Sequence, residues 1–138
     1  MKRLVSLLVV FVLLTGNVLA AGFSTDPVAM NDACMGVVKL EIYDVNDELI
    51  GSGSGFVAFA SDLIVTNCHV IADAHKIVAY SDVGDSYTVT DVLCVNSDKD
   101  VAIICFESPT DLPVLPLNES GEIFRASPVV AIGSPKGF

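Results

Sequence analysis

Short apolar segments separated by polar turns constrain the fold of this chain more than any other feature. Turn residues recur about every ten positions, which is typical of all-β sandwiches and barrels. The alternating segment Val37–Tyr43 predicts a half-buried strand, and the continuously apolar segment Val101–Phe106 predicts a fully buried one. A length of 138 residues suits one domain. Further strands are expected at residues 56–60, 63–65, 77–80, 87–95 and 129–132.

The central pair of these strands begins after a run of glycines and ends at a histidine. The sequence GSGSGFVAFASDLIVTNCHV covers residues 51–70. We expect residues 51–55 to form a turn, because glycine lets the backbone bend sharply and lie close to its neighbour. His69 follows the second strand, and a general base needs a rigid support of this kind. A lone histidine there would more simply cap a turn.

Several other motifs in this stretch fail on their spacing. The glycine run lacks the Gly-Lys-Ser/Thr ending of a phosphate-binding loop, and a strand rather than a helix follows it. It does not match the Gly-x-Ser-x-Gly nucleophile elbow either. A zinc site made of Cys68, His69 and His75 has no supporting Cys-x-x-Cys or His-x-x-x-His spacing.

An acidic residue provides a partner for the histidine. Asp100 stands at the start of the apolar segment Val101–Phe106. A carboxylate at the mouth of a strand can accept the Nδ1–H of an imidazole, fix its tautomer and stabilise the imidazolium formed during acyl transfer. We therefore interpret His69 and Asp100 as a candidate catalytic pair.

Five segments together resemble the trypsin-like serine proteases, and most closely the bacterial HtrA/Deg branch. They are GSGSGF, LIVTNCHVI, SDKDVAII, LPVLPL and VVAIGSPKGF, in the family's order within residues 37–138. The resemblance implies a six-stranded antiparallel Greek-key barrel, the first of two. It also implies that His69 is the general base, that Asp100 orients it, that substrates are proteins or peptides, and that no cofactor or metal is needed. Cys68, which in the family packs inward behind the histidine, and Ala126, where glycine is frequent, depart from the family pattern.

The nucleophile of such a protease is missing from this sequence. No Gly-x-Ser-Gly-Gly segment occurs in the 138 residues. We expect the chain to represent the N-terminal half of a secreted serine endopeptidase and to be inactive alone. The alternative is a non-catalytic binding or chaperone-like module that keeps the barrel. Substrate preference and oligomeric state are left open.

The N-terminus predicts export. Lys2 and Arg3 precede an apolar run over residues 4–14, and Ala20 marks a cleavage site, so residues 1–20 are typical of a secretory signal peptide. Residues 21–36 are expected to be a loosely ordered lead-in. Without the signal the chain has 5 Lys and Arg against 17 Asp and Glu, a net charge of −12. That charge argues against nucleic acid and against anionic membranes as partners. The predicted location is periplasmic or extracellular.

An oxidising compartment permits disulfides between the four cysteines, Cys34, Cys68, Cys94 and Cys105. We expect at least one bridge, with Cys68 and either Cys94 or Cys105 as its members. The sequence does not choose among the three complete pairings.

Overall fold

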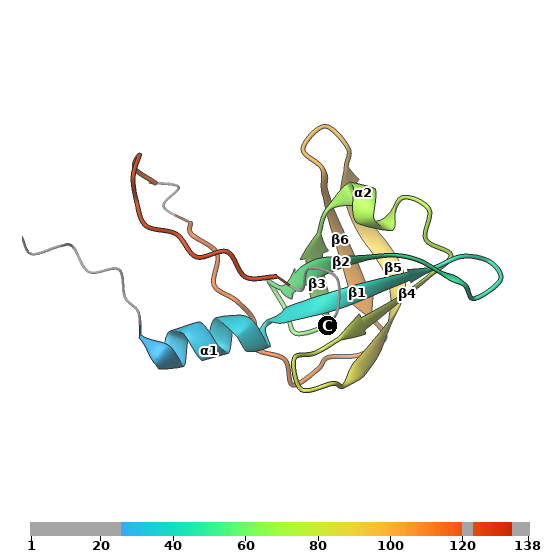
Figure 1. Ribbon diagram of the computed structural model, residues 1–138, viewed down its shortest axis with the longest axis horizontal. Coiled ribbons are helices and arrows are strands. Elements are labelled where there is room, and N and C mark those ends of the chain that lie inside the picture. The colour runs from blue at the N-terminus through green and yellow to red at the C-terminus, as the bar shows by residue number, and fades with distance from the viewer. Residues whose placement is uncertain (1–25, 120–122, 134–138) are drawn as a thin grey trace, which may run out of the picture.

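Six strands and two short helices make up the part of the chain that the computed structural model describes, residues 26–119 and 123–133 (Figure 1). The strands close into an antiparallel barrel in the order β1-β2-β3-β6-β5-β4. The predicted six-stranded antiparallel barrel is thereby confirmed. In chain order the elements are α1 (Pro27–Met35), β1 (Val37–Tyr43), β2 (Leu49–Val57), β3 (Leu63–Thr66), α2 (Cys68–Ile71), β4 (Lys76–Tyr80), β5 (Ser86–Asn96) and β6 (Val101–Phe106).

Alternation along the strands fills the barrel with aliphatic side chains. On β1, Val38 and Leu40 are fully buried, as the period of two predicted. They share the core with Ile64 of β3 and Ile104 of β6, which face each other across the β3–β6 ladder. Burying one such side chain stabilises the fold by about 1.5–3 kcal/mol. The core therefore ties together the two strands whose ends carry the candidate site.

The glycine run is part of a strand and not the predicted turn. Residues 51–55 lie within β2 and pair with β1, Gly53 opposite Leu40 and Gly55 opposite Val38. A Cβ on Gly53 would lie 2.5 Å from Val70 of α2, and one on Gly55 would lie 2.6 Å from Ile64. Here the glycines allow neighbouring elements to approach closely, which is the second of the two uses expected of them.

Two other strand expectations need correction. β6 is not buried on both faces, because Ala102, Ile104 and Phe106 face the core while Val101 is 39% exposed and Ile103 is only partly buried. A strand of a small barrel has one inward face, whatever the hydrophobicity of its other residues. Residues 129–132 form no strand. The six strands already close the barrel in this order, which leaves no ladder position for a seventh.

The segment before the barrel is more regular than expected. Residues 27–35 form α1, capped by the Asp26 carboxylate, which accepts the Val28 N–H at 3.0 Å. No residue of α1 is buried, and Figure 1 shows this helix extending away from the barrel. The predicted signal peptide, residues 1–20, lies outside the described residues. Within residues 26–119 and 123–133, no helix is long and apolar enough to cross a membrane.

The disulfide expectation is wrong for this structure, in which all four cysteines are free. Cys94 lies opposite Ile103 and Cys105 lies opposite Asp91, so the two cysteines are out of register on neighbouring strands. Cys68 starts α2, and Cys34 lies in α1.

Candidate active site

The histidine is held at the end of β3. Thr66, the last residue of that strand, is buried, and its hydroxyl donates to the Ser54 carbonyl at 2.9 Å. Asn67 then turns the chain with extended dihedral angles and becomes the N-cap of α2. His69 is the second residue of this helix. Its backbone is thus fixed by a strand end on one side and a helical turn on the other.

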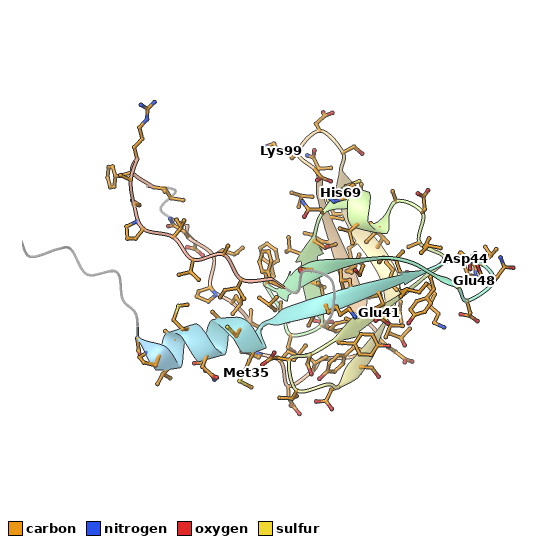
Figure 2. All side chains as sticks on the ribbon, in the orientation of Figure 1. Met35, Glu41, Asp44, Glu48, His69 and Lys99 are labelled. Atoms are coloured by element: carbon orange, nitrogen blue, oxygen red, sulfur yellow. The ribbon has the colours of Figure 1, made fainter. Side chains whose placement is uncertain are left out.

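The aspartate reaches the same place because β3 and β6 are antiparallel. Thr66 pairs with Ala102, so residues that follow Thr66 run alongside residues that precede Ala102. Asp100 directly precedes β6 and has a positive φ of 52°. This left-handed conformation, which Asp tolerates better than most residues, ends the β5–β6 turn. Figure 2 shows His69 at the same end of the barrel as that turn, which carries Lys99.

His69 and Asp100 are in direct contact, which confirms the predicted proximity. The His69 Nδ1 lies 2.6 Å from the Asp100 Oδ2, and the His69 backbone N–H donates to Oδ1 at 2.9 Å. The Asp100 carboxylate therefore binds both the main chain and the ring of His69. Such two-point attachment fixes the direction of the imidazole as well as its position.

The protonation of the pair follows from these contacts. Hydrogen bonds from His69 hold the pKa of Asp100 below its usual value. The backbone N–H of His69 has the largest effect, its ring has the next largest, and the Cys68 N–H contributes less. Asp100 is therefore ionised at neutral pH and can only accept hydrogen bonds. The proton in the 2.6 Å contact belongs to Nδ1, which leaves the lone pair of the neutral ring on Nε2.

The Nε2 side of the ring is open. The side chain of His69 is 72% exposed and that of Asp100 is 44% exposed. Among the described residues, none is hydrogen-bonded to Nε2. His69 also lines a cavity of about 200 Å³, together with Ser52, Val70 and Asp73. The arrangement can accept a proton from a group placed on this open side.

Cys68, next to His69 in the chain, has a contact of its own. The Cys68 thiol lies 3.8 Å from the Ser97 hydroxyl. Within residues 26–119 and 123–133, no three His, Cys, Asp or Glu side chains lie close enough together to hold a metal ion.

Sequence reasoning missed one residue of the site, Asn67. Its side-chain amide donates to the Asp100 carbonyl at 2.9 Å and to Oδ2 at 3.2 Å. The available signal was an asparagine between a strand and the histidine. That signal indicates a helix N-cap and not a contact with a residue far along the chain.

Comparison with known proteins agrees with this geometry. A model of the trypsin-like peptidase domain matches residues 53–138. The chain is 38% identical over 103 residues to serine protease HTRA1B of Danio rerio and 43% identical over 104 residues to serine protease HTR4 of Rattus norvegicus. In each case the match covers 72% of this chain and 21% of the relative. The chain therefore spans about a fifth of the length of these relatives.

A solved structure gives the same result. The serine endoprotease from Yersinia pestis superposes with a TM-score of 0.58 and 28% sequence identity, over 65% of this chain and 32% of that one. A domain model that covers more than half of the chain, relatives of one protease type and a matching barrel all agree. This chain belongs to the trypsin-like peptidase family, and within it to the HtrA type.

Proposed function

We propose that this chain supplies the general base and its orienting carboxylate to an exported serine endopeptidase. The observation that carries the proposal is the 2.6 Å contact between His69 Nδ1 and Asp100 Oδ2, with Nε2 facing the open side. In acyl transfer by such a pair, Nε2 takes the proton of a serine hydroxyl as its oxygen attacks the peptide carbonyl carbon. The imidazolium then gives that proton to the leaving amine.

Asp100 would remain ionised throughout this cycle. It would hold the ring in the Nδ1–H tautomer and stabilise the imidazolium that forms between the two proton transfers. The lowered pKa of Asp100 supports this role, because the carboxylate keeps its charge when the ring gains one. The serine and the oxyanion-binding groups would come from outside these 138 residues, where we expect a Gly-x-Ser-Gly-Gly segment.

We place the enzyme outside the cytoplasm and expect it to act on protein or peptide substrates. The basic residues Lys2 and Arg3, the apolar run over residues 4–14 and Ala20 support export. The exported protein should begin at Ala21 or Gly22, and an N-terminus at Met1 in secreted material would contradict export.

The experiment compares the two histidines of the sequence in the protein made from the complete reading frame. His69→Ala should abolish cleavage of a fluorogenic peptide, because nucleophile and base act as a unit. His75→Ala is the matched control: His75 is exposed, its N–H binds the Tyr43 carbonyl through the main chain, and cleavage should persist. A serine-directed phosphonylating reagent should inactivate the wild-type protein.

Three results would count against the proposal: cleavage that survives His69→Ala, no reaction with the reagent, or a complete reading frame without a serine segment. The last result would favour the non-catalytic module.

A further inference from the structure

Asn67 occupies the position of a helix cap but does not act as one. It is the N-cap residue of α2, where an asparagine side chain normally accepts a backbone N–H from the first turn. Its side chain makes no such hydrogen bond. The amide instead turns toward the β5–β6 turn and Asp100.

The two contacts of the amide have the same polarity. The Asp100 backbone carbonyl lies 2.9 Å from Asn67 Nδ2, and the Asp100 Oδ2 lies 3.2 Å from it. Both partners are oxygens that can only accept, so the amide nitrogen and not its oxygen must face them. Asn67 is therefore a double donor to a single residue.

Asp100 takes over the capping role that Asn67 leaves. Its Oδ1 accepts the N–H of His69, the second residue of α2, at 2.9 Å. A carboxylate there is also favoured by the positive end of the helical turn. Asp100 therefore caps the helix that carries His69, and Asn67 in turn binds Asp100.

The backbone of Asp100 explains why it needs holding. Its φ of 52° is in the left-handed region, and its own N–H makes only a long contact of 3.3 Å to the Ser97 carbonyl. The Asn67 amide binds the carbonyl of this residue and its side chain together. That contact fixes the backbone conformation and the carboxylate direction at the same time.

We propose that Asn67 is a positioning residue for the catalytic pair, acting through Asp100 and not on the substrate. This inference rests on the proposed function of His69 and Asp100. In it, the hydrogen bonds from Asn67 keep Oδ2 aimed at the ring Nδ1–H, which keeps Nε2 aimed at the nucleophile. Loss of the amide lowers the rate of the chemical step and leaves substrate binding unchanged.

Two substitutions separate positioning from capping, in the complete protein with a peptide substrate. Aspartate caps a helix as well as asparagine, whereas alanine caps poorly. If Asn67 were only a cap, Asn67→Asp would behave as wild type and Asn67→Ala would be worse. If it is a donor to Asp100, Asn67→Asp is the worse variant, because its carboxylate faces two acceptor oxygens and a like charge.

The expected result for Asn67→Ala is a kcat about tenfold to thirtyfold lower, as for two lost hydrogen bonds, with KM changed by less than about twofold. The loss for Asn67→Asp should be larger. Asn46→Ala is the matched control, because its amide also donates to an aspartate, Asp44, at 3.1 Å, in the β1–β2 turn. Figure 2 shows Asp44 and Glu48 of that turn well away from His69. This variant should keep wild-type kcat.

A second readout does not depend on activity. The Nδ1 proton of His69 should exchange with water faster in Asn67→Ala than in wild type, as measured by NMR, because the Asp100 carboxylate is held less firmly. A wild-type kcat in Asn67→Asp, or an unchanged exchange rate in Asn67→Ala, would overturn the inference. Because His69→Ala tests the proposed function separately, an inactive His69→Ala combined with normal Asn67 variants refutes the role of Asn67 alone.

Discussion

Gly53→Ala should disturb the site through Val70, the residue that follows His69 in α2. A Cβ at position 53 would lie 2.5 Å and 2.8 Å from the two γ-methyl carbons of Val70, and 3.3 Å from its Cβ. Carbon atoms in contact sit about 3.5–4.0 Å apart, so something must move by about 1 Å. Valine is stiff at χ1, and the movement should therefore pass to the backbone of α2.

Two effects of different size follow. Overpacking of this kind costs about 1–3 kcal/mol of the free energy of unfolding. For a barrel of this size that corresponds to a melting temperature lower by roughly 5–20 °C. Val70 is also the residue next to His69 in α2. A displacement of about 1 Å at the general base can reduce kcat by about 100-fold in the complete enzyme.

The assay is a double-mutant cycle read by thermal unfolding. Val70→Ala removes both γ-methyl groups and leaves 3.3 Å as the nearest contact, so it should restore part of the stability lost in Gly53→Ala. The coupling between the two substitutions should be about 1–2 kcal/mol. Gly51→Ala is the control for stability, because a Cβ there meets nothing within 4 Å. An unchanged melting temperature in Gly53→Ala, or no rescue by Val70→Ala, would contradict the close packing of Gly53 against Val70.

Two further predictions concern β6 and the site carboxylate. Ile104→Ala should lower the free energy of unfolding by about 2–5 kcal/mol, because Ile104 is fully buried and lies opposite Ile64. Ile103→Ala should lower it clearly less, because Ile103 is only partly buried. Equal losses for the two variants in chemical denaturation would contradict the assigned strand faces. The native pKa of Asp100 is lowered, so its charge stabilises the fold above the unfolded value of about 3.9, and this stability is lost as the pH falls through the native value. The stability advantage of wild type over Asp100→Asn should therefore shrink as the pH falls below the unfolded value, and an advantage that acid leaves unchanged would contradict the contact.

The periodicity of β1 could be read from the sequence, but that of β6 could not. Val37–Tyr43 alternates in sequence, and the burial of its residues alternates in the structure as well. Val101–Phe106 is apolar at every position, so its residues gave no sign of which side faces the core, and Ile103 was wrongly expected inside. Only the pairing with β3, which places Ile104 opposite Ile64, decides the inward face.

The glycines and the last apolar segment show a different limit. A run of glycines predicts a turn from local preference, but here close approach by Val70 and Ile64 requires them within a strand. Residues 129–132 are apolar and β-prone, yet strand formation needs a free ladder partner, which the closed barrel does not offer. Both outcomes depend on tertiary contacts that no local pattern contains.

Part of the candidate site could likewise be predicted from the sequence, and part could not. The pairing of His69 with Asp100 was predicted because each stands at the end of an apolar strand, a feature visible in the sequence. The part played by Asn67 was not, because its contacts depend on the positive φ of Asp100 and on the antiparallel register of β3 and β6. Chain turns that bring distant residues together leave little trace in single-residue preferences.

The ring tautomer of His69 can be measured directly by ¹⁵N NMR at pH 8, with His75 as an internal reference. In the wild-type chain, Nδ1 should carry the proton and donate it to the Asp100 carboxylate, and Nε2 should carry the lone pair. In Asp100→Asn this preference should be lost. A wild-type ring protonated at Nε2, or a ring signal that Asp100→Asn leaves unchanged, would contradict the claim that Asp100 prepares His69 as a general base.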